Sequence, residues 1–165
     1  MDIETFAREF GDKMNEVRSF VEGDDIKDIL GVEAVNHYKE SFSNEGFTDK
    51  QTVKWANVKR RDPGSPWYGH SGQTGKFSES RTKASILSGE TRELRESISY
   101  AKIPLGVRIT NDAPYASVHQ FGEKAKIYGK KEFTMIARPF MGKSAKMVNR
   151  IKRKINNQLK NILQS

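Results

Sequence analysis

The stretch from Asn111 to Gly142 reads NDAPYASVHQFGEKAKIYGKKEFTMIARPFMG and decides how the rest of the chain is arranged. Its first residues, Asn111 and Asp112, can cap a helix, and Pro114 suits the first turn. Gly122 is a typical helix stop. The segment PYASVHQF therefore predicts a helix of about two turns, which is too short to be stable alone and must dock on another part of the chain.

The same stretch carries an aromatic helix face followed by a strand-like segment. Tyr115, His119 and Phe121 give the helix an aromatic surface, and the polar groups of these rings need hydrogen-bond partners. We therefore expect the three side chains to pack on a sheet. Residues 133–140 then alternate in part like a strand, which ends at Pro139 because proline cannot donate a ladder hydrogen bond. Gly142 marks the end of this segment, and a long basic helix follows.

Two motifs in this stretch, YAxxHQFG and ARPFxG, resemble those of the phage virion morphogenesis or tail completion proteins of Mu-like and P2-like phages. Either motif alone is weakly specific, but both occur here in order, with a predicted strand pair before them and a helix after. The resemblance spans residues 32–162, is weakest at 60–83, and departs from the family at Arg92, where a glycine usually follows the threonine. The matching positions are Gly106, Tyr115, Ala116, His119, Gln120, Phe121, Gly122, Ala137, Arg138, Pro139, Phe140 and Gly142.

The resemblance implies a structural protein of phage or prophage virion assembly, without enzymatic activity, that completes the tail or forms part of the head-tail neck as a ring. The implied partners are other copies of the chain, in a ring that forms either in solution or only on the tail, and the tail tube and neck or connector proteins. The implied location is the virion tail or neck, after assembly in the host cytoplasm. The candidate assembly surface consists of Tyr115, His119, Gln120, Phe121, Gly122, Arg138, Pro139, Phe140 and Gly142.

Composition limits the other function classes. A length of 165 residues with 35% hydrophobic residues predicts one domain, residues 1–165. The absence of cysteine excludes disulfides, thiolate zinc sites and a cysteine nucleophile, and fits a reducing compartment. The acidic N-terminus and the lack of a long apolar run predict neither a signal peptide nor contact with a membrane. We therefore expect a cytosolic protein.

Charge is strongly polarised along the chain. Residues 1–49 contain 13 acids and 5 bases, a net charge of −8, whereas residues 133–165 contain 8 bases and no acid. This asymmetry suggests either an anionic partner for the basic end or neighbouring subunits that meet acid to base, and simply solvated helix faces would fit equally well. Composition alone thus supports an alternative function, a basic cytosolic nucleic-acid-binding module without sequence specificity.

Apolar spacing predicts three long helices. Residues 3–21 and 24–42 each repeat apolar side chains at three- and four-residue steps and should form one layer, with Gly31 as a candidate break in the second helix. Residues 143–163 form a basic helix with an apolar stripe. Its bases Lys152, Arg153 and Lys154 are candidates for a subunit contact or for non-specific contact with phage DNA in a channel.

The middle of the chain predicts a small sheet. Residues 88–98 predict a short helix, and residues 97–103 and 106–110 predict a β-hairpin. Together with the strand at 133–140, this hairpin gives an antiparallel sheet of three to four strands packed against the long N- and C-terminal helices, an α+β fold. Trp55 is predicted to anchor the core.

Residues 61–82 are rich in Gly, Pro, Ser and Thr and predict either a mobile loop or a loop that becomes ordered only on assembly. The GQTGKF sequence within it is not a phosphate-binding loop, because His70 replaces the first glycine and Phe77 follows the lysine. The histidines are scattered and no catalytic motif occurs, so we predict no catalytic residue, cofactor or metal. We expect His119 to be a packed, hydrogen-bonded histidine, and Arg138 to pair with a carboxylate or a helix C-terminus.

Overall fold

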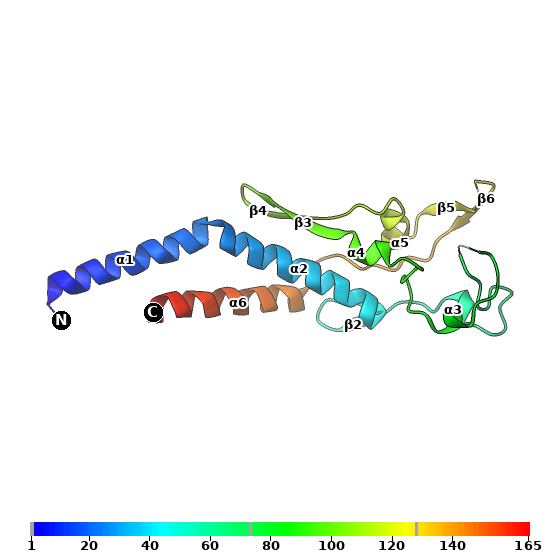
Figure 1. The fold of residues 1–165 in the computed structure, drawn as a ribbon, viewed down its shortest axis with the longest axis horizontal. Coiled ribbons are helices and arrows are strands. Elements are labelled where there is room, and N and C mark those ends of the chain that lie inside the picture. Colours follow the sequence, from blue (N-terminus) through cyan, green and yellow to red (C-terminus); the bar gives the residue numbers. More distant parts are fainter. Residues whose placement is uncertain (1, 73, 128) are drawn as a thin grey trace.

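The computed structural model describes residues 2–72, 74–127 and 129–165, and the chain is elongated (Figure 1). Helices α1 (Ile3–Glu22) and α2 (Asp24–Asn44) follow one another with a bend, and α6 (Ala145–Gln164) runs beside them. The strands and the short helices lie along α2 and beyond its C-terminal end (Figure 1). The predicted long N- and C-terminal helices and the α+β class are confirmed.

Local signals set the ends of these helices. The Asp2 carboxylate accepts a hydrogen bond from the Thr5 backbone amide at 2.8 Å and so caps α1, and Ser144 caps α6 through the Met147 amide at 3.1 Å. The bend falls at Gly23, where an added Cβ would lie 2.4 Å from the Ser19 carbonyl oxygen. Gly31 does not break α2, contrary to expectation. It leaves room for the Tyr100 ring, which an added Cβ would approach to 2.2 Å.

The strands form three separate antiparallel pairs among the described residues, so the predicted single sheet of three to four strands is wrong. The pairs are β1 (Gly46–Thr48) with β2 (Thr52–Lys54), β3 (Ile98–Ile103) with β4 (Gly106–Asn111), and β5 (Lys124–Ile127) with β6 (Lys131–Thr134). The β3–β4 pair, which runs from Ile98 opposite Asn111 to Ile103 opposite Gly106, confirms the predicted hairpin.

The predicted strand at 133–140 is also corrected, because only its first two residues belong to β6 and residues 135–140 join no ladder. Pro139 has no backbone N–H for a ladder. The backbone groups around it are instead bonded by side chains from elsewhere in the chain, as described below.

Short helices connect these elements: η1 (Lys59–Arg61), α3 (Glu79–Lys83), α4 (Glu93–Glu96) and α5 (Ala116–Phe121). The helix predicted at 88–98 is limited to α4, because Gly89 and Arg92 adopt left-handed backbone angles, with φ of 57° and 58°. Within residues 61–82, Arg61 ends η1 and residues 79–82 belong to α3. The residues between them, apart from residue 73, which lies outside the described residues, are turns and irregular backbone with one isolated bridge between His70 and Phe77. Their mobility and the single-domain assignment stay predictions.

The hydrophobic core lies where α2 meets the loops that follow β2 and β6. Phe42 on α2 is the centre of this contact, since its ring centroid is 5.7 Å from that of Trp55 and 5.4 Å from that of Phe140. Trp55 is buried, as predicted. The buried core residues are Ala34, Tyr38, Phe42, Trp55, Ile86, Leu94, Ile98, Ala113 and Phe140. None of the described helices is long and apolar enough to cross a membrane.

Truncating Phe140 to alanine should destabilise the protein strongly. Its side chain is only 1% exposed, so the substitution leaves a cavity, and we expect a loss of about 3 to 5 kcal/mol in the free energy of unfolding. Urea denaturation measures this loss. Phe121→Ala is the matched control, because this phenylalanine is 69% exposed and its loss should change stability by about 0.5 kcal/mol or less. Equal losses in the two variants would contradict this account of the core.

Candidate functional site

Residues 138–142, RPFMG, form an extended segment, here called the strap, that leads from the loop after β6 towards α6. Helix α5 holds it from one side. The backbone amide of Arg138 donates to the His119 carbonyl oxygen at 2.7 Å. The side-chain oxygen of Gln120 accepts from the amides of Phe140 and Met141 at 3.0 and 3.2 Å, and its Nε2 donates to the Met141 carbonyl oxygen at 2.7 Å. Gln120 thus replaces the hydrogen bonds that a neighbouring strand would supply.

The other strap carbonyls accept hydrogen bonds from core side chains. The Trp55 indole N–H donates to the Pro139 carbonyl oxygen at 2.7 Å. Ser41 and Tyr38, both on α2, donate to the carbonyl oxygens of Phe140 and Gly142 at 3.2 and 3.0 Å. The Tyr38 hydroxyl is partly buried, and this burial raises its pKa. The strap therefore joins α5, α2 and the start of α6 in one network, which explains why the two motifs occur together.

Arg138 lies inside this network and not on the surface. Its guanidinium donates to the carbonyl oxygens of Ala56, at 3.1 and 3.2 Å, and of Asn57, at 3.2 Å. The prediction that Arg138 pairs with a carboxylate or a helix C-terminus is therefore wrong, because the side chain is buried against the loop that follows Trp55. Burial lowers the pKa of Arg138. Its hydrogen bonds fix the course of that loop.

The predicted aromatic face of α5 is divided. Tyr115 and His119 meet edge to face with ring centroids 5.9 Å apart, and the Tyr115 hydroxyl donates to a Glu93 carboxylate oxygen at 2.7 Å. Burial, together with this carboxylate, raises the pKa of Tyr115 to about 12. Phe121 is instead exposed, contrary to the expectation that it packs on a sheet. Successive residues of a helix are about 100° apart, so Phe121, two residues after His119, points to the opposite side of α5, whereas Tyr115 and His119, four residues apart, share one side.

His119 is partly buried, and burial lowers its pKa, with a further contribution from the charge of Arg138. Among the described residues, its Nδ1 has no hydrogen-bond partner. The expected packing is therefore present without the expected side-chain hydrogen bond. Gly122 ends α5 with φ of 73°, and an added Cβ would lie 2.9 Å from the Ala137 amide nitrogen, so this position requires glycine.

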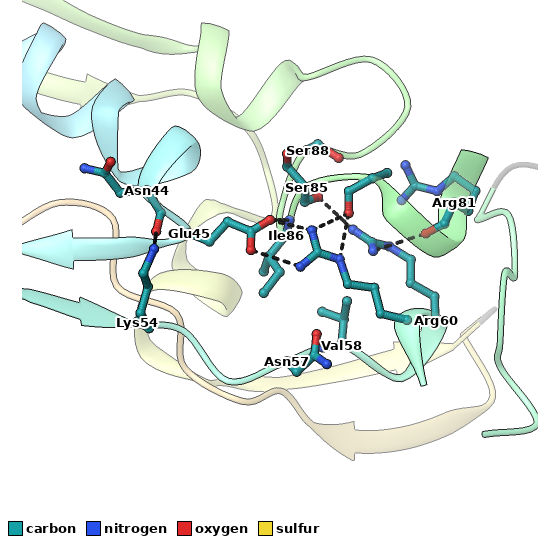
Figure 2. Close-up of polar contacts among 12 residues, drawn as sticks. Asn44, Glu45, Lys54, Asn57, Val58, Arg60, Arg81, Ser85, Ile86 and Ser88 are labelled. Atoms are coloured by element: carbon teal, nitrogen blue, oxygen red, sulfur yellow. Dashed lines mark hydrogen bonds and ion pairs between the residues drawn. The ribbon is translucent and has the colours of Figure 1, made fainter. Parts of the chain in front are cut away.

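A cavity of about 330 Å³ opens beside Tyr115 and His119. Its lining includes three arginines, Arg60, Arg81 and Arg138. Arg60 donates to the Ser85 carbonyl oxygen at 2.7 Å (Figure 2), and burial, with the positive charge of Arg81, lowers its pKa to about 10. These guanidinium groups bond mainly backbone carbonyls in this region, which indicates that they hold loops in place.

Glu45, at the end of α2, is the anionic partner in this region. Arg61 binds both carboxylate oxygens of Glu45, at 2.9 and 2.5 Å, and also donates to the Ala84 carbonyl oxygen. The Ile86 amide donates to the same carboxylate at 3.0 Å. The Arg61 hydrogen bonds lower the pKa of Glu45. Sequence reasoning missed this cluster, because Arg60 and Arg61 lie in a loop without periodicity and only the fold brings Glu45 to them.

The basic candidates on α6 are separate from the strap network. Lys154 forms an ion pair with the buried Glu33 on α2 at 2.5 Å, and its neighbour Arg150 binds both carboxylate oxygens of Glu40 at 2.7 and 2.9 Å. Lys152 and Arg153 are exposed and have no ion-pair partner among the described residues. Helix packing therefore uses Lys154 and leaves Lys152 and Arg153 free for an external contact.

The structure thus collects most of the motif residues into one place. Gln120, Arg138 and Phe140 hold the strap, Tyr115 and His119 line the adjacent cavity, and Gly122 permits the close approach of α5. Comparison with family models gives a match to the phage virion morphogenesis family over residues 50–160, which includes both motifs. The chain belongs to this family. A comparison with curated proteins gives no match, and a comparison with solved structures gives none either.

Membership in this family makes the protein a structural component of phage virion morphogenesis. The match begins after α1 and α2, so these two helices lie outside the region that the family model describes. Among the described residues, no group of three or more histidine, aspartate or glutamate side chains is arranged to hold a metal ion.

Replacing Gln120 with alanine should loosen the strap. The substitution removes three hydrogen bonds and leaves the amides of Phe140 and Met141 without partners, which should cost about 2 to 3 kcal/mol in the free energy of unfolding. Gln120→Glu is the matched variant, since it keeps an acceptor for both amides but places an oxygen against the Met141 carbonyl. Both losses are measurable by urea denaturation, and a stability equal to the wild type in both variants would show that the strap does not depend on Gln120.

Proposed function

We propose that this protein completes the phage tail at its head-proximal end or forms part of the neck between head and tail, and that it works as a ring of identical subunits. The observation that carries the proposal is the family match, which spans both motifs and the network built from them. The partners are other copies of the chain and the tail tube and neck or connector proteins. Its place is the virion, and it reaches that place from the host cytoplasm.

Charge and exposure support the ring. A ring needs heterologous contacts, in which one surface of a subunit meets a different surface of the next. The acidic N-terminal helices and the basic α6 are surfaces of opposite sign. In addition, α6 has no fully buried residue, although its apolar stripe faces α2 and α1. Part of this stripe is therefore available to another subunit.

A second function rests on Lys152 and Arg153, the exposed bases of α6. If α6 faces the channel through which DNA passes, these bases make weak contacts with phosphate that do not depend on sequence and fade with salt. The same bases would serve the alternative function, a nucleic-acid-binding module without sequence specificity. The tail or neck role has more support, because the family match is to virion morphogenesis proteins.

Electron microscopy of particles made without this protein tests the proposed function. We expect heads filled with DNA and separate tails that fail to join, or tails of irregular length, because the end of the tail is not completed. Supplying the protein from a plasmid should restore joined particles. Normal infectious particles in its absence would refute the tail or neck role.

Reversing the free bases separates their role from that of Lys154. In the double variant Lys152→Glu and Arg153→Glu, we expect normal stability and at least tenfold fewer joined particles, because a subunit or DNA contact is lost. Lys154→Gln should instead lower the free energy of unfolding, because it leaves Glu33 with fewer partners in a buried site. Plaque counts and urea denaturation measure the two effects. Normal particle yield with the double variant would remove the assembly and DNA roles of these bases.

A further inference from the structure

The N-terminal half of α1 exposes an apolar stripe that the described part of the chain leaves uncovered. The side chains of Ile3, Phe6 and Phe10 are 82%, 56% and 54% exposed, and the two phenylalanine rings stack with centroids 6.0 Å apart. Figure 1 shows that this half of α1 runs past the end of α6. Large exposed apolar side chains in one row are typical of a protein contact.

Acidic side chains accompany this stripe. Residues 2–12 contain four acids, Asp2, Glu4, Glu9 and Asp12, and a single base, Arg8. We call residues 2–12 the arm. Because the arm is both apolar and negatively charged, its partner should offer an apolar hollow with positive charge at the rim.

A hollow with these properties lies at the start of α6. It has a volume of about 480 Å³, and its lining includes Tyr38, Met147 and Val148. Val148 is 43% exposed although it is apolar. Lys143 lines the hollow, and Ala145 lines it too. Lys146 is the next residue after Ala145, and both lysines are exposed. Asp49 also lines the hollow, but its carboxylate accepts a hydrogen bond from the Ala145 amide at 2.6 Å.

The arm cannot reach the hollow of its own chain. The Lys13 ammonium donates to the Ser165 hydroxyl at 2.8 Å, which places the middle of α1 at the C-terminal end of α6. Val148 is near the opposite end of α6, 17 residues from Ser165, or about 25 Å along the helix axis at about 1.5 Å per residue. From Lys13, the arm extends still further from the start of α6, where the hollow lies (Figure 1). Only another molecule can bring an arm to the hollow.

We propose that the arm of one copy docks in the hollow at the start of α6 of the next copy. Phe6 and Phe10 fill the apolar hollow, and the acids of the arm face Lys143 and Lys146. Each subunit then offers one arm and one hollow, so the contact is heterologous and all contacts are satisfied only when the chain of subunits closes. This inference rests on the proposed ring and names the surfaces that form it.

The chain contains no cysteine, so introduced cysteines report this contact without background. Two single variants, Phe10→Cys and Val148→Cys, are purified, mixed at high concentration and oxidised under mild conditions. We expect a disulfide-linked dimer in the mixture that exceeds the dimer in either variant alone by at least tenfold, because a disulfide forms only when the two Cβ atoms come within about 4.5 Å. Leu105→Cys, at a fully exposed residue of the turn between β3 and β4 that belongs to neither surface, replaces Val148→Cys in the control mixture and should give no such excess.

Solution size provides an independent measurement. The double variant Phe6→Ser and Phe10→Ser should sediment as a monomer at concentrations where the wild type forms larger species, and its circular dichroism should be unchanged because both rings are already exposed. No excess of the mixed disulfide over the control, or equal sedimentation of variant and wild type, would overturn the arm contact. If the mixed disulfide does not form but the plasmid-borne protein restores joined particles, only the arm contact is refuted. A strong mixed disulfide with normal particles in the absence of the protein would instead refute the proposed function.

Discussion

The backbone of the strap, residues 138–142, must be hydrogen-bonded without a sheet, and the rest of the structure depends on how this is done. Pro139 interrupts any ladder, so Gln120, Trp55 and two side chains of α2 supply the missing partners. Since these residues come from distant parts of the sequence, the hydrogen bonds to this one short segment fix α5, α2 and the loop after β2 relative to each other. Phe140, buried at its centre, adds the apolar contact with Phe42 that stabilises this arrangement.

The basic side chains of the protein have two different environments. The arginines near the strap, such as Arg60 and Arg138, lie within the fold, where they donate hydrogen bonds to loop carbonyls and hold segments that have no regular secondary structure. By contrast, Lys152 and Arg153 on α6 and the acids of the arm are exposed. The charged residues behind the net charge of +8 therefore fall into two groups, one that stabilises the fold and one that is exposed to solvent.

The elongated shape leaves some helix faces uncovered. Helix α2 has one side in the core and is contacted by both α1 and α6, but α1 and α6 have no further layer over them in the described residues. A helix pair without a third layer leaves apolar stripes partly exposed. Such a fold is suited to the proposed ring, in which neighbouring copies would supply the missing layer.

Sequence by itself determined the long helices, the β3–β4 hairpin, the role of Trp55 and the family, because these depend on local spacing, caps and turns. It also identified the two motifs as belonging together. It could not determine that Arg138 bonds carbonyls, that Gln120 replaces a strand, that Phe121 faces solvent or that Glu45 meets Arg61. Those outcomes depend on which distant segments become neighbours, and no periodicity along the chain records that. Only the tertiary structure therefore decided that residues 135–140 are held by side chains and not by a sheet, because Pro139 excludes a ladder bond but does not indicate what takes its place.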